Sequence, residues 1–283
     1  MSGAKIIVLG APATGKTHYA GQLLGRMRHL RNGILRLRPG GTDDLRHLEE
    51  VLDCLEDGRS AGHTPSQTWV GMKWELETLH GSTVELQWPE YAGERLSTLM
   101  DNRRIETEWR ESIAAAQGWM LFLRPTGLVI QEDVLSRPAL GIPTNQPGNA
   151  RQVLRTQWDD RARYVELLQM LLFVSGRSTY QRISHPRLAI IMSCWDELEE
   201  NGSTPMEVFE DRLPLVHAFV RSTWSDSSWS VWGLSSLGRA LRPDTSDPEF
   251  LSNGPENFGY VIPPESAVRD DDLTAPVAWL LDL

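Results

Sequence analysis

The chain has 283 residues, which is enough for one large domain with its own buried core. Its formal net charge is −10 and its isoelectric point is about 5.2, and this acidic balance argues against a nucleic-acid partner, which favours a basic patch. No apolar run approaches the ~20 residues of a membrane span, and Cys54 and Cys194 lie too far apart in sequence for a metal-type pair. We therefore expect a cytoplasmic protein with reduced thiols, no membrane span and no nucleic-acid partner.

The first strand-like stretch, 6–9, enters a glycine-rich loop that reads GAPATGKT over 10–17, and a helical pattern follows to about Leu30. This is the phosphate-loop or Walker A pattern, in which glycines let backbone N–H groups approach phosphate oxygens at the positive end of a helix. Lys16 is expected to reach the β- and γ-phosphates, and the Thr17 hydroxyl to ligate Mg²⁺. The loop therefore predicts a nucleotide-phosphate site made of Gly10, Ala13, Thr14, Gly15, Lys16, Thr17 and His18.

Strand-like and helix-like segments alternate along the rest of the chain. The patterns predict strands over 34–37, 69–76, 83–88, 118–123, 187–192 and 230–234, and helices over 17–30, 43–57, 95–116, 157–174, 204–222 and 273–283. The strands at 69–76 and 83–88 are expected to form an antiparallel hairpin. Segment 124–156 is expected to be a Pro/Gly-rich insertion, and 242–283 an extended C-terminal segment that loops over the surface as far as 272.

This alternation predicts an α/β fold with a mostly parallel, doubly wound sheet and one antiparallel hairpin strand, in a single domain spanning 1–283. Ligands of such sheets bind outside the carboxyl ends of the strands. Polar groups follow the predicted strands at three further places, namely 90–94, 193–196 and 235–237. Together with the phosphate loop, these segments are candidates for one nucleotide site.

The ordered set of segments resembles the Ras-like P-loop GTPases of the translation-factor-related class. In these proteins a phosphate loop is followed by a switch threonine, an Asp-x-x-Gly turn, an Asn-Lys-x-Asp base reader and a Ser-Ala-type loop. Within that class the chain is most similar to bacterial double-GTPase-type domains of predicted conflict and signalling systems. The similarity covers nearly the whole chain, and its most telling stretches are WPEYAGERL, IIMSCWDEL and DLTAPVAWLL. It implies a Ras-like G domain that binds GTP and GDP with Mg²⁺.

The turn and the switch threonine depart from the family pattern. Glu90 replaces the aspartate of the turn, and the resemblance implies a contact with Mg²⁺ through water; an ordinary acidic turn is the alternative. Gly93 would offer its N–H to the γ-phosphate, and Glu94 falls where Ras-like enzymes carry a water-orienting glutamine. Thr64 and Thr68 are both candidates for the switch threonine. The candidate catalytic residues are Lys16, Glu94 and these two threonines.

The base reader is reduced to its last residue. Segment 193–196 reads SCWD, so only Asp196 remains to accept hydrogen bonds from guanine, while Trp195 or Cys194 is a candidate to cover the ring in place of lysine. Asp196 could instead cap a helical turn, since aspartate is a good N-cap. Ser235 and Ser236 are expected to add contacts to the base, unless they form an ordinary turn.

The sequence thus favours a Mg²⁺-dependent GTPase, a hydrolase whose loops switch with the nucleotide and bind a protein partner, in a bacterial conflict or signalling system. Two alternatives remain open. One is a P-loop ATPase or small-molecule kinase, which the missing Asn-Lys favours. The other is a pseudo-GTPase that holds nucleotide without hydrolysing it, which Glu90 and Glu94 both allow.

Overall fold

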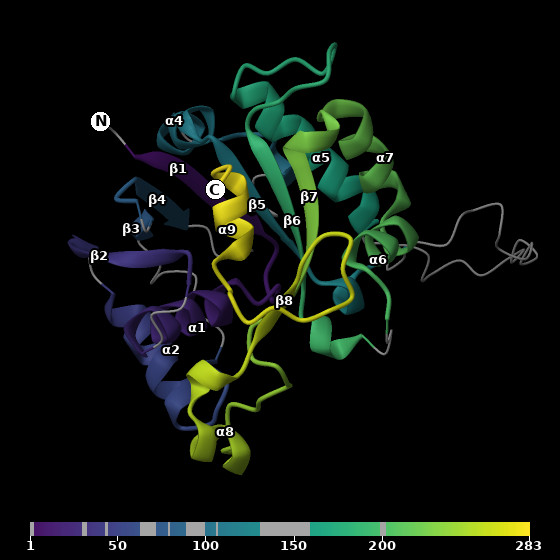
Figure 1. Ribbon diagram of the computed structural model, residues 1–283. Helices are drawn as coiled ribbons and strands as arrows, with labels where there is room; N and C mark the ends of the chain where they lie inside the picture. The colour runs from purple at the N-terminus through teal and green to yellow at the C-terminus, as the bar shows by residue number, and fades with distance from the viewer. Residues whose placement is uncertain are drawn as a thin grey trace, which may run out of the picture.

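The computed structural model describes residues 3–29, 33–42, 45–62, 72–78, 80–88, 100–105, 107–130, 159–198 and 202–283. Within these residues, eight strands form one sheet in the order β2-β3-β4-β1-β5-β6-β7-β8 (Figure 1). The strands are β1 (Ala4–Gly10), β2 (Leu35–Thr42), β3 (Met72–Thr78), β4 (Thr83–Trp88), β5 (Gly118–Leu123), β6 (Arg187–Ser193), β7 (Trp229–Ser235) and β8 (Tyr260–Ile262). The helices are α1 (Lys16–His29), α2 (Arg46–Glu56), α4 (Thr107–Ala115), α5 (Asp160–Val174), α6 (Pro205–Arg212), α7 (Pro214–Thr223), α8 (Pro248–Asn253) and α9 (Ala275–Leu280).

The centre of the sheet is parallel. Strand β1 pairs in parallel with both β4 and β5, and β5, β6 and β7 continue the parallel order. Strand β3 pairs antiparallel with β4 and with β2, and β8 pairs antiparallel with β7. The predicted mixed α/β fold with a mostly parallel sheet and an early antiparallel hairpin is therefore confirmed.

Side chains along the central strands alternate between two cores. In β1, Ile7 and Leu9 belong to the core that also contains residues of α4, α5, α6 and α7. Ile6 and Val8 belong to the opposite core, together with residues of α1, α2 and α9. Figure 1 shows α9 lying in front of the central strands. Because both faces are covered, every residue of β5 is buried, which explains its uninterrupted apolar sequence GWMLFL.

Two boundaries near the amino end differ from the prediction. Strand β2 continues through Pro39 to Thr42, beyond the predicted end at 37, and its pairing register with β3 shifts between Leu37 and Thr42. An edge strand tolerates proline because one side of its backbone has no strand neighbour. Because the strand extends to Thr42, the next helix, predicted over 43–57, begins later, and α2 starts at Arg46.

The segment expected to loop over the surface, 242–272, instead contains α8 and β8. The chain over 258–273 also holds α1 in place through backbone carbonyl groups. Tyr19 Oη donates to the Leu273 carbonyl oxygen at 2.9 Å, and Arg26 donates to the carbonyl oxygens of Phe258 and Gly259, each at 2.7 Å. This irregular chain was not predictable from periodicity, because side chains of a distant helix satisfy its backbone groups.

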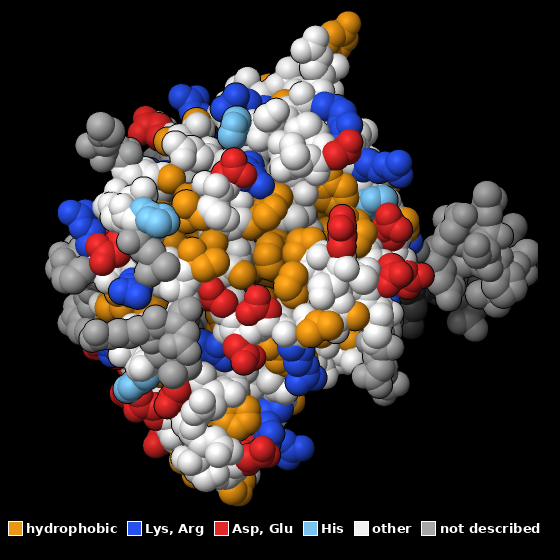
Figure 2. Space-filling model, in the orientation of Figure 1, with side chains coloured by type: hydrophobic (Ala, Val, Ile, Leu, Met, Phe, Trp, Pro, Cys, Tyr) orange, Lys and Arg blue, Asp and Glu red, His pale blue; other side chains and the backbone are white. Residues whose placement is uncertain are grey.

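The surface carries charges of both signs. On the face shown in Figure 2, Lys and Arg side chains are interspersed with Asp and Glu side chains and with hydrophobic ones. No helix in the described ranges has both the length and the hydropathy to cross a bilayer.

The contact between α1 and α2 generates a stability prediction. A Cβ atom added to Gly21 would lie 2.5 Å from Val51 Cγ1, a branched and therefore stiff side chain. We expect Gly21→Ala to lower the free energy of unfolding by about 1–2 kcal/mol, because overpacking outweighs the higher helix propensity of alanine. Urea unfolding followed by circular dichroism measures the change.

Gly25 offers a matched control on the same helix. A Cβ atom there would lie 2.9 Å from Leu52 Cδ1, the end of a flexible side chain that can rotate away. Gly25→Ala should therefore be neutral or stabilising by up to about 1 kcal/mol. Equal effects of the two substitutions would contradict the proposed close approach at Gly21.

Candidate functional site

The loop between β1 and α1 has a backbone that requires glycine at two positions. Gly10 has φ +153°, and a Cβ atom there would lie 2.9 Å from both Cβ and the carbonyl oxygen of Phe122. Gly15 has φ +76°, in the left-handed region that disfavours other residues. Ala13 also adopts a left-handed conformation, with φ 56°. A non-glycine residue in this region is strained, and such strain clusters at ligand-binding sites.

The ammonium group of Lys16 lies inside this loop. Its Nζ donates hydrogen bonds to the carbonyl oxygens of Gly10 at 2.8 Å and Ala11 at 2.6 Å, and to Thr14 Oγ1 at 3.0 Å. Burial lowers the pKa of Lys16 from 10.5 to about 7. Three oxygen acceptors thus surround a partly buried cation. Such a cation is stabilised when an anion binds beside it.

The start of α1 carries the other predicted residues of the loop. Thr14 is buried and donates its hydroxyl proton to the Ala11 carbonyl oxygen at 2.8 Å. Thr17 lies in the first turn, one residue after Lys16, and is partly buried. The ring of His18 hydrogen-bonds the backbone of Ala61, and burial lowers its pKa. His18 therefore connects the helix to segment 58–62.

The loop after β6 folds back toward the phosphate loop. Ser193 Oγ donates to the Leu123 carbonyl oxygen at 3.0 Å, which links the ends of β6 and β5. Cys194 adopts a left-handed conformation, and its Sγ lies 3.6 Å from the point where a Cβ atom of Gly15 would stand. Burial raises the pKa of the Cys194 thiol to about 11. A neutral thiol therefore faces the phosphate loop.

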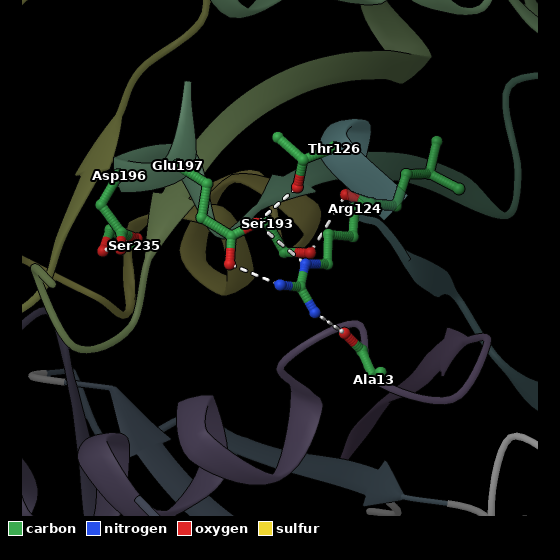
Figure 3. A network of polar contacts seen from close by, with 8 residues as sticks. Ala13, Arg124, Thr126, Ser193, Asp196, Glu197 and Ser235 are labelled. Carbon is green, nitrogen blue, oxygen red and sulfur yellow. Dashed lines mark hydrogen bonds and ion pairs between the residues drawn. The ribbon is translucent and has the colours of Figure 1, made fainter. Parts of the chain in front are cut away.

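Asp196 is bound by the neighbouring strand. It lies within a short 3₁₀ helix, Trp195–Glu197, whose N-cap residue is Cys194 and has no capping side-chain bond. The Asp196 carboxylate accepts a hydrogen bond from Ser235 Oγ at 2.5 Å, and Ser235 Oγ accepts one from the Gly238 N–H at 2.9 Å. Asp196 and Ser235 therefore form a polar pair across the ends of β6 and β7 (Figure 3).

A further charged group, missed by the sequence reasoning, joins these two regions. Arg124, the first residue after β5, donates to both carboxylate oxygens of Glu197, from Nε at 2.9 Å and from NH2 at 2.5 Å. Its NH1 donates to the carbonyl oxygen of Ala13 in the phosphate loop at 3.2 Å. Figure 3 shows the guanidinium between that loop and the Asp196 segment. The hydrogen bond with Glu197 raises the pKa of Arg124.

The structure thus brings together the phosphate loop and Asp196 with Ser235 and Ser236, on the carboxyl ends of β1, β6 and β7. The remaining predicted site residues lie outside the described part of the chain. They are Thr64, Thr68, Glu90, Gly93 and Glu94.

Solved structures show distant likenesses to this chain. The Arl6 BBS3 small GTPase from Trypanosoma brucei, with bound nucleotide analogue GppNp, has a TM-score of 0.43 and 9% identity, covering 99% of this chain and 96% of that one. A signal recognition particle receptor complex, SRb-GTP/SRX from Chaetomium thermophilum, has a TM-score of 0.39 and 12% identity, with 86% and 94% covered. A bacterial selenocysteine-specific elongation factor, EF-Sec, has a TM-score of 0.36 and 12% identity, with 83% of this chain covered. This chain spans 26% of that elongation factor's length.

A search of proteins with curated descriptions gives no significant match. A protein-family model described as Double-GTPase 1, in contrast, matches residues 7–280. The match begins in β1, just before the phosphate loop, and ends at the last residue of α9, so it includes Lys16, Arg124, Asp196 and Ser235. The chain therefore belongs to the Double-GTPase 1 family.

Proposed function

We propose that the protein binds GTP and GDP at the carboxyl ends of β1, β5, β6 and β7 and hydrolyses GTP in a Mg²⁺-dependent manner. The observation that carries this proposal is the Lys16 ammonium group, enclosed by the oxygens of its own loop and partly deprived of its charge by burial. Membership of the Double-GTPase 1 family supports the same function. An anion of high charge, such as a triphosphate, is proposed to bind beside this ammonium group.

The base of the nucleotide is proposed to face Asp196. Guanine presents two N–H donors on the edge that a carboxylate would accept, whereas adenine presents an acceptor at N1, which a carboxylate repels. The hydroxyl of Ser235 orients the Asp196 carboxylate, and Ser236 lies next along the same loop. The hydrogen bond from Ser235, which holds the Asp196 carboxylate at this edge of the sheet, supports the proposal.

The Thr17 hydroxyl, beside Lys16 in the first turn of α1, fits a Mg²⁺ ligand. Glu90 is proposed to contact the same ion through water. Mg²⁺ bound there would neutralise phosphate charge that develops during γ-phosphoryl transfer. Gly93 is proposed to donate its N–H to the γ-phosphate, and Glu94 to orient the attacking water, with Thr64 or Thr68 as the switch threonine.

The protein is further proposed to act as a cytoplasmic molecular switch that binds a protein partner in a bacterial conflict or signalling system. The segment 58–62 contacts α1 through the hydrogen bond between His18 and Ala61. A conformational change at the phosphate loop could therefore be transmitted to the segment that precedes Thr64. The free cysteines, Cys54 and Cys194, support a reducing compartment.

Replacing Lys16 tests the phosphate site. Lys16→Ala removes the cation that would meet the phosphates, so we expect it to abolish tight binding of GTP and GDP while the protein stays folded. Thermal-shift titrations with GTP, GDP and ATP, with and without Mg²⁺, measure binding. Lys73→Ala is the matched control, because Lys73 is exposed on β3. Wild-type affinity in Lys16→Ala would refute the phosphate-loop assignment.

The lowered pKa of Lys16 predicts proton uptake on binding. At pH 8 the ligand-free group, with a pKa of about 7, is mostly neutral, and phosphate charge favours its protonated form. Binding of Mg²⁺–GTP at pH 8 should therefore take up roughly one proton, and at pH 6, where Lys16 is already charged, it should take up none. Calorimetry in two buffers with different ionisation enthalpies reports the uptake. Equal binding enthalpies in both buffers at pH 8 would exclude the mechanism.

Asp196 is expected to set base choice. Asp196→Asn should weaken GTP binding roughly tenfold, because it removes a charge-assisted hydrogen bond. It should improve binding of xanthosine triphosphate, whose 2-oxo group accepts a hydrogen bond from the asparagine amide. Competition binding of GTP, ATP and xanthosine triphosphate measures the ranking. Ser235→Ala, which only removes the orienting hydroxyl, should weaken GTP less and leave the ranking intact. An unchanged ranking in Asp196→Asn would reopen the ATPase alternative.

A further inference from the structure

We propose that Arg124 is a nucleoside-binding residue, which covers the base or the ribose between the phosphate loop and Asp196. The inference rests on the proposed nucleotide site and assigns to it a contact that none of the sequence motifs contains. It explains how the chain can read a base although its base-reading segment has lost the lysine.

The order of the strands places Arg124 on the path of the ligand. The phosphate loop follows β1, the Asp196 segment follows β6, and β5 lies between these two strands. Arg124 is the first residue after β5. A nucleotide with its phosphates in the loop and its base at Asp196 must therefore cross the end of β5, where Arg124 stands (Figure 3).

The contacts of Arg124 fix the plane of its guanidinium group across this path. One end of the group holds both carboxylate oxygens of Glu197, the residue after Asp196, and the other end reaches the Ala13 carbonyl oxygen. Thr126 Oγ1 donates to the same carboxylate and so orients it. A two-point pair between guanidinium and carboxylate is rigid as well as strong, so the flat face of Arg124 is already oriented before a ligand arrives.

The guanidinium retains the capacity to bind a ligand. Among the described residues, its contacts use three of its five N–H donors, which leaves one hydrogen on each terminal nitrogen for an oxygen of the ribose or base. The side chain is 35% exposed, whereas the Glu197 carboxylate already balances its charge. Planar guanidinium groups also stack on aromatic rings.

The two residues that the sequence offered for covering the ring are both committed elsewhere. Trp195 is only 8% exposed and belongs to the hydrophobic core. Its ring packs so closely on β7 that a Cβ atom on Gly233 would lie 2.8 Å from Trp195 Cδ2. The Cys194 thiol faces Gly15 at the phosphate end. In the described part of the site, Arg124 is the side chain placed to take this role.

The proposal is tested by comparing ligands that contain or lack a nucleoside. We expect Arg124→Ala to weaken GTP and GDP equally, by roughly tenfold, and to change the affinity for inorganic tripolyphosphate by less than about threefold. Arg124→Lys keeps the charge but has no flat face, so its affinity for GTP and GDP should fall nearly as far as that of Arg124→Ala. Calorimetry with the full-length chain measures all three ligands.

Arg182→Ala is a matched control. Arg182 also pairs with a carboxylate, that of Asp226, and donates to a backbone carbonyl oxygen, that of Trp224 at 2.7 Å. It lies before β6, at the amino end of the strands, so its loss should leave every affinity unchanged.

Three other results would overturn the inference. An equal loss for tripolyphosphate would mean that Arg124 only supports the phosphate loop through Ala13. Slower GTP hydrolysis with unchanged GDP affinity would mean that it acts on the γ-phosphate. Wild-type affinities in the Arg124 variants would remove it from the site while leaving the proposed function intact. If the wild-type protein binds tripolyphosphate but no nucleotide, the proposed function itself fails.

Discussion

The site depends on a lysine cation that the chain encloses with its own backbone. To place Lys16 Nζ within hydrogen-bond distance of Gly10 and Ala11, the loop must turn sharply off β1 and return to start α1. That path needs glycine at positions 10 and 15 and a strained Ala13. Burial of the cation is unfavourable without a counter-charge, so the folded loop stores part of the free energy that an anion would release on binding. The cores on the two faces of the sheet keep this arrangement in place, because they bury the last five residues of β1, 6–10.

The carboxyl ends of the parallel strands carry different polar groups across the sheet. The end of β1 carries the glycine-rich loop with Lys16, the end of β6 carries Asp196, and the end of β7 carries the hydroxyl that hydrogen-bonds Asp196. The end of β5 has no sequence motif, but it supplies the Arg124 guanidinium, which links the loop after β1 to the segment after β6. Such a division follows from parallel topology, since only parallel strands bring successive ends to one edge.

Some of these features can be predicted from the sequence and others cannot. The difference lies in how far apart in the sequence the residues that form each feature are. The phosphate loop is encoded by eight contiguous residues, and buried strands such as β5 are encoded by their own composition, so both could be predicted. Asp196 was predictable from its order after a strand, but its partner Ser235 is 39 residues away, so the hydrogen bond between them was not predictable. Arg124 and Glu197 are 73 residues apart, and neither residue alone signals the pair. Strand β8, with three residues, is defined by its pairing with β7 rather than by any pattern.

The attachment of the C-terminal segment to α1 has a consequence for synthesis of the protein. Tyr19 and Arg26 of the first helix reach their partners only at residues 258–273, more than 230 positions later in the chain. Chains are made from the amino end at about 5–20 residues per second, so α1 emerges from the ribosome many seconds before the carbonyl groups that complete its environment. During that interval Tyr19 and Arg26 of a nascent chain lack these hydrogen-bond partners. The environment of α1 is thus completed only after residues 258–273 have been made.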